Sequence, residues 1–360
     1  MKDEYGRQID YLRISITDRC NLRCAYCMPD GVTLVPREEI LRKDEFIRIA
    51  RAAAGIGVRH IKVTGGEPLV RGCCTGLVSG LKKVPGIDTV TLTTNGILLA
   101  ARLRDFREAG IDGINISLDT TDPEVYRQLT GGGDVSKVIE SIKTSADLGI
   151  RTKVNVVTGA AEQARARMKE GASQEAFRKM PAGESRENGN SGRDEELCFD
   201  PGLLRLAEDY PVDVRFIEMM PIGYGARHRE SDNRSVFRQL LERYPDMRKD
   251  QSRHGFGPAV YYRIPGFGGS IGFISAIHGR FCSSCNRVRL TSMGFFKTCL
   301  AYGDGADLRA ILRDEKTGEE EKDRKLEEAM REAILRKPSG HCFDHPEKIT
   351  EKHLMASIGG

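Results

Sequence analysis

Long apolar runs are missing from this chain. No stretch of its 360 residues approaches the roughly 20 consecutive apolar residues that a membrane-spanning helix needs. The N-terminal segment, MKDEYGRQID, is polar and lacks the apolar run of a secretory signal. We therefore expect a cytoplasmic protein with no membrane partner.

A strong excess of one charge sign is missing as well. Charged residues make up 30% of the chain, but the formal net charge is only +4. So mild a balance gives no reason to expect a nucleic-acid partner. Apolar residues reach 39%, which is enough for a sizeable core, and the length suits two domains at about 150 residues each.

What the chain does have is ten cysteines. Disulfides are rare in reducing compartments, so these thiols call for another explanation. Six of them form two triplets, namely Cys20, Cys24, Cys27 and Cys282, Cys285, Cys299. The other four show no ligand spacing. We interpret the two triplets as ligands of metal ions or clusters.

The first two thirds of the chain alternates β-branched runs with amphipathic helices. The expected strands begin at Tyr11, His60, Thr89, Gly113, Arg151 and Val212. Helices are expected between them, for example over 44–56, 100–109 and 135–148, and Gly110 and Gly149 follow the last two. This alternation predicts an α/β fold, an incomplete (β/α)6 TIM-like barrel with its chemistry at the C-terminal strand ends.

The alternation ends near residue 225. We predict a barrel domain over 1–225 and a smaller α+β domain over 226–360, with strands in AVYYRI, SIGFISAI and NRVRLTS and a charged helix over 319–336. Residues 159–196 interrupt the barrel pattern with few large apolar side chains. We expect this stretch to be a solvated, partly disordered insertion, because it cannot bury enough surface to offset its ordering entropy.

The first cysteine triplet directly follows the first strand. It reads C-x3-C-x2-C within DRCNLRCAYCMP. A cubane iron–sulfur cluster needs four ligands, so three thiolates leave one iron open for a substrate or cofactor. Zinc is the competing interpretation, but it lacks a fourth ligand nearby, since the next histidine, His60, lies in a strand.

This triplet resembles that of the radical S-adenosylmethionine superfamily. Thr64-Gly65-Gly66-Glu67-Pro68, after the second strand, is similar to the GGEP motif of the same superfamily. The resemblance implies that Cys20, Cys24 and Cys27 hold a [4Fe–4S] cluster that binds and cleaves S-adenosylmethionine to give a deoxyadenosyl radical.

The second triplet reads C-x2-C-N-R-V-R-L with a further cysteine x13 on. A structural zinc site is an open alternative here. Arg287 and Arg289 alternate along the expected strand and therefore face one side. They indicate either recognition of phosphate or another anion, or a solvated strand face.

Taken together, the motifs resemble one family, that of molybdenum cofactor biosynthesis protein A, the GTP 3′,8-cyclases. The resemblance is carried by both triplets, GGEPL, TTNG, RFIEMMPIG and the terminal Gly359-Gly360. It implies a lyase that converts GTP to (8S)-3′,8-cyclo-7,8-dihydroguanosine 5′-triphosphate. The implied cofactors are S-adenosylmethionine and two [4Fe–4S] clusters, the second on Cys282, Cys285 and Cys299.

The resemblance also implies residue roles. Those implied to bind S-adenosylmethionine are Tyr26, Gly66, Ser117 and Met220. Those implied to bind GTP are Arg13, Lys62, Thr93, Lys153, Arg287, Val288 and Arg289. Those implied to act in catalysis are Arg287, Arg289, Gly359 and Gly360. The implied partners are an electron donor such as flavodoxin or ferredoxin and a downstream cyclic pyranopterin monophosphate synthase. A homodimer is compatible with the sequence.

Two alternatives remain at this point: a peptide-modifying radical enzyme with an auxiliary cluster, and a zinc-stabilised binding protein without activity. Colour separates the last from the others. We expect anaerobically purified protein to be brown and to contain iron, measured by absorbance and metal analysis; a colourless zinc protein would contradict both cluster assignments.

Overall fold

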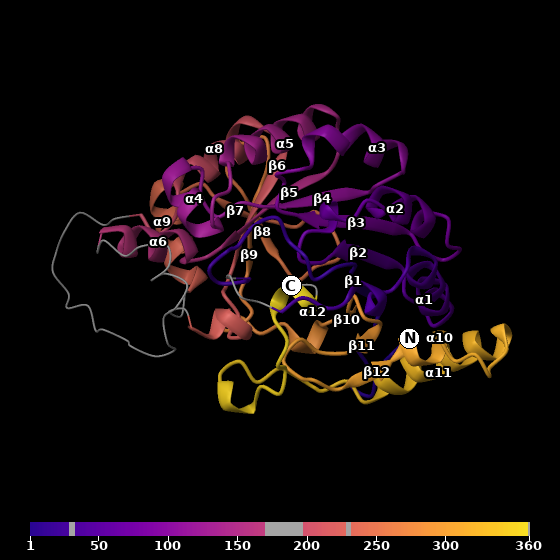
Figure 1. The fold of residues 1–360 in the computed structure, drawn as a ribbon. Coiled ribbons are helices and arrows are strands. Elements are labelled where there is room, and N and C mark those ends of the chain that lie inside the picture. Colours follow the sequence, from indigo (N-terminus) through magenta and orange to yellow (C-terminus); the bar gives the residue numbers. More distant parts are fainter. Residues whose placement is uncertain (29–32, 170–196, 228–231, 359–360) are drawn as a thin grey trace.

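A single sheet organises the chain. The computed structural model describes residues 1–28, 33–169, 197–227 and 232–358. Within these residues, twelve strands hydrogen-bond in the order β12-β11-β10-β1-β2-β3-β4-β5-β6-β9-β8-β7. Figure 1 shows helices arching over one face of this sheet and the C-terminal segment crossing the other side.

Six consecutive parallel strands form the centre of the sheet. They are β1 (Tyr11–Ser15), β2 (His60–Thr64), β3 (Thr89–Thr94), β4 (Gly113–Ser117), β5 (Thr152–Val157) and β6 (Val212–Ile217). Each pairs in parallel with the next along the chain. All six lie where the β-branched runs predicted strands.

Helices connect these strands, and one more, α9, follows β6. They are α1 (Lys43–Gly55), α2 (Cys74–Lys82), α3 (Leu103–Glu108), α4 (Pro123–Thr130), α5 (Val135–Asp147), α6 (Ala160–Lys169), α8 (Pro201–Asp209) and α9 (Asn233–Arg243). Aspartate side chains cap four of them, as helix N-termini favour. Gly110 and Gly149 adopt positive φ values of 80° and 67° and end α3 and α5 as predicted.

Helix α6 corrects one expectation. Residues 160–169 of the supposed disordered insertion are helical, and Ala160, Ala161 and Ala164 pack into an apolar cluster with Val125 and Leu129 of α4. Small side chains permit this close packing, although the stretch has few large apolar residues. The remainder of the insertion, 170–196, lies outside the described residues.

The C-terminal segment extends the sheet at both edges. Strand β10 (Arg287–Leu290) pairs in parallel with β1, followed outward by β11 (Phe295–Lys297) and β12 (Gly305–Asp307). At the other edge, β9 (Ile271–Ile274) pairs in parallel with β6, followed by β8 (Val260–Arg263) and β7 (Arg248–Asp250). Because β7 and β12 are opposite edges, the barrel is incomplete, as predicted.

The remaining helices lie in the C-terminal segment or in loops. The α-helices are α10 (Leu308–Leu312), α11 (Glu319–Leu335) and α12 (Met355–Ile358). Short 3-10 helices span Arg37–Glu39, Pro68–Val70, Ala100–Arg102, Gly223–Arg227, Cys282–Ser284 and Pro346–Lys348. Among the helices that the structure describes, none has the length and apolar character to cross a bilayer.

Alternation along the parallel strands separates two faces. The outer face is apolar and packs into the main core with the helices; it includes Leu12, Ile14, Ile61, Val63, Leu92, Ile116, Val154 and Phe216. The inner face carries the intervening polar residues, which include Arg13, Lys62, Thr91, Asn115, Lys153 and Arg215. Since successive side chains of a strand point to opposite faces, every inner residue is held in place by buried outer neighbours.

Phe216 tests the junction between the barrel strands and the C-terminal segment. It is 0% exposed and its ring lies 5.9 Å from that of Phe199 and 5.8 Å from that of Phe273, on β9. We expect Phe216→Ala to lower the free energy of unfolding by about 3–5 kcal/mol through lost burial and a cavity, measured by urea unfolding of the apoprotein. The control Leu241→Ala, at a side chain 42% exposed, is expected to stay within about 0.5 kcal/mol of wild type. Equal losses in both variants would contradict this account of the junction.

Candidate active site

The first cysteine triplet lies in the loop that leaves the C-terminal end of β1. Cys20, Cys24 and Cys27 are free thiols, and their charges influence one another's ionisation. The Cys20 sulfur accepts the Leu22 amide at 3.4 Å and lies 3.8 Å from the Asn95 side-chain nitrogen. His60 lies at the other end of its strand, β2, where the chain enters the sheet.

Burial makes these thiols poor anions when they stand alone. It raises the pKa of Cys24 well above its usual value, with Cys27 and Cys20 adding to the rise, and it raises the pKa of Cys27 to about 12. A bound metal centre reverses this preference, because a coordinating thiol is deprotonated outright. Three clustered sulfurs with N–H donors to one of them therefore fit an iron–sulfur cluster.

The GGEP motif packs directly against this loop. The Gly66 amide donates to the Thr17 carbonyl at 2.7 Å, and the Glu67 amide donates to the Arg19 carbonyl at 2.8 Å. A Cβ on Gly66 would lie 2.4 Å from the Arg19 carbonyl oxygen. Glycine is therefore required here by close backbone approach, so the loop that carries Cys20 depends on the motif after β2.

Glu67 is enclosed beneath the loop. Its carboxylate accepts the Leu69 amide at 2.9 Å, the Thr94 hydroxyl at 2.8 Å and the Asn95 amide at 2.7 Å. Burial nevertheless raises the pKa of Glu67 to about 7. Asn95, in the predicted TTNG motif, thus contacts both the acidic residue and the Cys20 sulfur.

A second buried carboxylate lies beside Tyr26. The Tyr26 hydroxyl donates to Asp119 at 2.7 Å, and burial raises the pKa of Asp119 to about 6. Asp119 follows β4, which ends at Ser117, so Tyr26 and Ser117 lie near one strand end. Glu162 of α6 also has a pKa raised by burial to about 7. This end of the sheet is therefore acidic, a feature that the sequence motifs alone did not indicate.

The second cysteine triplet lines a separate cavity beside β10. Cys282, Cys285 and Cys299 share it with Met220, Arg287 and Arg289. Although burial raises the pKa of Cys285, the neighbouring Lys337 and Arg287 bring it below the usual value. Three thiols in one cavity beside cations fit a cluster that carries negative charge.

Basic side chains lie along the inner face of the sheet between the two triplets. Three of them lie in register on neighbouring strands: Arg289 on β10, Arg13 on β1 and Lys62 on β2. Burial lowers the pKa of Lys62 well below its usual value, and repulsion from Arg215, Arg13, Lys153 and Arg287 adds to the drop. The predicted residues Arg13, Lys62, Lys153, Arg287 and Arg289 thus belong to one positively charged group.

Two other predicted GTP residues lie differently. Thr93 is on the inner face and its hydroxyl accepts the Asn115 amide at 3.3 Å. Val288 is 0% exposed and its side chain belongs to the main core. A contact between Val288 and a ligand on the inner face would therefore involve its backbone.

Arg215 was not predicted as a site residue, although it lies in the RFIEMM motif. It is 7% exposed, and its guanidinium donates to the Asn155 side chain at 3.1 Å through Nε. With Lys62, Lys153, Asn115 and His254 it lines a cavity of about 420 Å3. Alternation with the apolar Val214 and Phe216 could have indicated that Arg215 faces the inner side, but only the pairing of β6 with β5 brings it beside Lys153.

A loop from β7 to β8 closes the end of this cavity where the central strands begin. His254 lies between Asp213 and Asp250, at 3.0 and 2.9 Å, and stacks on Tyr261. Phe256 stacks on His60 with ring centroids 3.3 Å apart. The stacked rings and the ion pairs of this loop therefore form the boundary of the cavity at that end.

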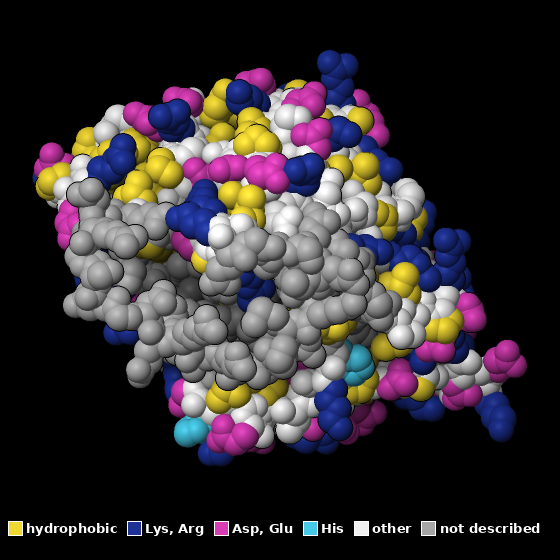
Figure 2. Space-filling model, turned by 60° about the vertical axis from the view of Figure 1, so that its left-hand side comes forward, with side chains coloured by type: hydrophobic (Ala, Val, Ile, Leu, Met, Phe, Trp, Pro, Cys, Tyr) yellow, Lys and Arg dark blue, Asp and Glu magenta, His cyan; other side chains and the backbone are white. Residues whose placement is uncertain are grey.

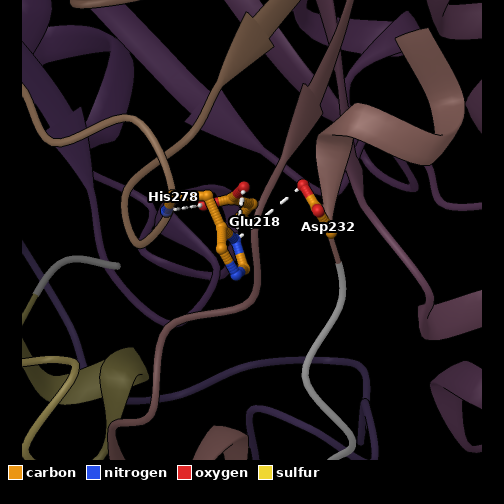
Figure 3. Close-up of side chains that lie close together, drawn as sticks. All are labelled: Glu218, Asp232 and His278. Carbon is orange, nitrogen blue, oxygen red and sulfur yellow. Dashed lines mark hydrogen bonds and ion pairs between the residues drawn. The ribbon is translucent and has the colours of Figure 1, made fainter. Parts of the chain in front are cut away.

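Glu218 joins the end of β6 to the segment before Cys282. Figure 3 shows its carboxylate beside His278 and Asp232. Glu218 Oε1 lies 3.1 Å from His278 Nδ1. The other Glu218 oxygen accepts the amides of Ile277 and His278 at 2.8 and 3.1 Å. These bonds hold Met220 and Cys282 around the same cavity.

The C-terminal helix enters between the two triplets. The backbone of Ala356, in α12, hydrogen-bonds to Cys27, and the Ile358 carbonyl accepts from Arg289 at 3.4 Å. Gly359 and Gly360, predicted to act in catalysis, lie outside the described residues. Helix α12 itself lies beside β1 (Figure 1).

The outer surface carries no single charge sign over the face seen in Figure 2. There, described Lys and Arg side chains are interspersed with Asp and Glu. Buried cations are instead concentrated on the inner face of the sheet.

Two family matches cover most of the chain. Residues 14–165 match the Radical SAM superfamily, and residues 212–343 match the family described as Molybdenum Cofactor Synthesis C. Among curated proteins, the GTP 3′,8-cyclase of Clostridium perfringens (strain 13 / Type A) is 37% identical over 361 residues, with 100% of both chains covered. The GTP 3′,8-cyclase of Rhizobium etli (strain CIAT 652) is 38% identical over 370 residues, covering 100% of this chain and 94% of the relative.

A solved structure shares the fold. Streptococcus suis SuiB bound to S-adenosylmethionine aligns with a TM-score of 0.58 at 13% identity, covering 96% of this chain and 77% of that chain. The likeness confirms the predicted partial barrel.

Glu67 predicts a pH dependence of stability. Its pKa is raised from an ordinary 4.5 to about 7 in the folded state. Folding is therefore favoured by this group below about pH 4.5, and the contribution is lost as the pH rises to about 7, at a cost of about 3 kcal/mol. The glutamine side chain of Glu67→Gln is neutral at every pH. We therefore expect the difference in unfolding free energy between wild-type and variant apoprotein to change by about 3 kcal/mol from pH 5 to pH 8.

Urea unfolding at the two pH values measures this difference. The surface variant Glu124→Gln provides the control and is expected to follow wild type at both. A constant difference between wild type and Glu67→Gln across the range would show that Glu67 is already ionised at pH 5.

Proposed function

The chain belongs to the GTP 3′,8-cyclase family of the radical SAM superfamily, and on this premise we propose that it converts GTP to (8S)-3′,8-cyclo-7,8-dihydroguanosine 5′-triphosphate, the first step of molybdenum cofactor biosynthesis. In this role the enzyme is a lyase. Relatives that carry this name match the chain over its whole length.

The observation that carries the proposal is the buried group of cations on the inner face. Lys62 has no ion pair with a carboxylate in the described part of the chain, and Lys153 is paired with Asp213. Burial lowers the pKa of Arg13 to about 10, with Arg287 and Arg215 contributing repulsion. A triphosphate brings several negative charges to these side chains and relieves both the desolvation and the repulsion.

The acidic end of the sheet suits the second reactant. S-adenosylmethionine carries a sulfonium and an ammonium group, and Glu67 and Asp119 supply buried carboxylates near Cys20 and Cys24. Tyr26, Gly66 and Ser117 at this end, and Met220 at the cavity of the second triplet, are the proposed S-adenosylmethionine residues. Cys20, Cys24 and Cys27 would hold the first [4Fe–4S] cluster, which together with this cofactor supplies a deoxyadenosyl radical.

The residues between the triplets orient the substrate. Arg13, Lys62, Lys153 and Arg215 bind the triphosphate toward the wall formed by His254 and Phe256. The ribose and guanine then point toward the cavity of Cys282, Cys285 and Cys299, proposed ligands of the second [4Fe–4S] cluster. Arg287 and Arg289 line that cavity, and we propose that they act in catalysis together with Gly359 and Gly360, which lie outside the described residues.

This arrangement disfavours the peptide-modifying alternative, because a buried cationic group of this size suits a compact polyanion rather than a neutral backbone. An electron donor such as flavodoxin or ferredoxin, a downstream cyclic pyranopterin monophosphate synthase and a cytoplasmic location complete the proposal. A possible homodimer stays a prediction.

An anaerobic assay tests the proposal. Protein reconstituted with iron and sulfide is reduced and given S-adenosylmethionine with and without GTP, and deoxyadenosine and nucleotide products are followed. We expect deoxyadenosine together with a cyclised GTP product. For Lys153→Met and Arg215→Met we expect KM for GTP to rise roughly 10- to 100-fold, about 1.4–2.8 kcal/mol of lost binding.

The exposed variant Arg127→Met, on α4, serves as the control and is expected to match wild type. Deoxyadenosine formed while GTP stays intact would overturn the substrate assignment but leave the radical chemistry.

A further inference from the structure

Lys337 is a buried cation whose hydrogen-bond partners are backbone carbonyls. Its residue is 3% exposed, and its ammonium donates to the carbonyl oxygens of Arg287, at 3.0 Å, and Thr298. Within the described residues, these are its hydrogen bonds, and no carboxylate pairs with it. Burying an ammonium without an anion is costly, so an uncompensated charge at this position requires a partner.

The two carbonyls belong to the framework of the second triplet. Arg287 lies two residues after Cys285, and Thr298 directly precedes Cys299. Lys337 therefore ties together the two segments that carry these cysteines, which come from different turns of the chain.

Arg7 fixes the third cysteine and Lys337 relative to each other. Its guanidinium donates to the Cys282 carbonyl at 3.1 Å, to that of Pro338 at 2.7 Å and to that of Ser339 at 2.9 Å. An ion pair with Asp3 at 2.6 Å neutralises Arg7. Lys337 thus enters the cavity from a backbone segment that Arg7 fixes to Cys282. In the part of the chain that the structure describes, no carboxylate forms an ion pair with Lys337.

Lys337 lines the same cavity as Cys282, Cys285 and Cys299. Burial lowers the pKa of Lys337, and Cys285 and Cys299 are the first two groups that oppose this effect. A cluster ligated by thiolates carries net negative charge, which increases when the cluster accepts an electron. A fixed buried cation next to it stabilises the reduced form more than the oxidised form.

We infer that Lys337 is a positioning residue for the second cluster: it frames the segments of Cys285 and Cys299 and its charge raises the reduction potential of that cluster. The inference rests on the proposed function, in which Cys282, Cys285 and Cys299 hold a [4Fe–4S] cluster.

The experiment isolates that cluster in the full chain. The parent carries Cys24→Ala and Cys27→Ala, so that iron and the electron paramagnetic resonance signal come from the second triplet. Lys337→Met, Lys337→Arg and Lys337→Gln are made in this parent, reconstituted anaerobically and titrated with reductant.

For Lys337→Met we expect the midpoint potential to fall by about 59 mV or more, a tenfold change in the one-electron equilibrium constant. Lys337→Arg, which keeps the charge, is expected to stay closer to the parent. Lys337→Gln keeps a hydrogen-bond donor but not the charge, and we expect its midpoint potential to fall as in Lys337→Met. The Gln variant therefore provides the measurement if the Met variant assembles too little cluster. The matched control is Lys322→Met on α11, a similarly buried lysine that pairs with Glu319.

The outcomes separate the two levels of the argument. A parent that binds no iron overturns the proposed function at the second triplet. A parent with about four irons per chain, together with charge-free variants at an unshifted midpoint, overturns the role of Lys337 alone. A fall in Lys322→Met equal to that in Lys337→Met also overturns it, because the effect would not depend on proximity to the cysteines.

Discussion

Repulsion among buried cations is the constraint on which the rest of this structure depends. Arg13 and Lys62 lie on one inner face with Arg215, and burial, reinforced by repulsion from neighbouring cations, lowers the pKa of both Arg13 and Lys62. This arrangement persists because the alternate residues of the same strands, such as Leu12 and Val63, are locked into an apolar core under the helices. Folding energy from the outer face thus holds positive charge on the inner face, where the proposed substrate would bring negative charge.

The same sheet brings together chemistry from both ends of the chain. Strand β10 pairs with β1, so Arg289 stands in register with Arg13 although 276 residues separate them in numbering. This pairing places the second triplet beside the inner face, while the loop after β1 carries the first. An acidic environment around Glu67 and Asp119 and a basic one around Lys62 then divide the site, which suits one cationic and one anionic reactant.

Buried cations also act within the framework. Arg7 is neutralised by Asp3 and binds carbonyls, which is a structural arrangement with a complete set of partners. Lys337 uses carbonyls in a similar way but lies beside thiols instead of a carboxylate. Arg7, which is paired with a carboxylate, therefore has a structural role, whereas the charge of Lys337 acts on the proposed cluster site.

The sequence by itself determined the central strands, the helix ends at Gly110 and Gly149 and both cysteine triplets, because these depend on local periodicity, backbone conformation and spacing. It also placed Arg287 and Arg289 on one face, since strand alternation is a local property. It missed helix α6, whose small side chains give a weak signal until α4 packs against them. Only the tertiary structure decided that β10 lies next to β1, that Arg215 joins Lys62 and Lys153, and that Lys337 reaches the second triplet. These depend on contacts between residues distant along the chain, which no local pattern encodes.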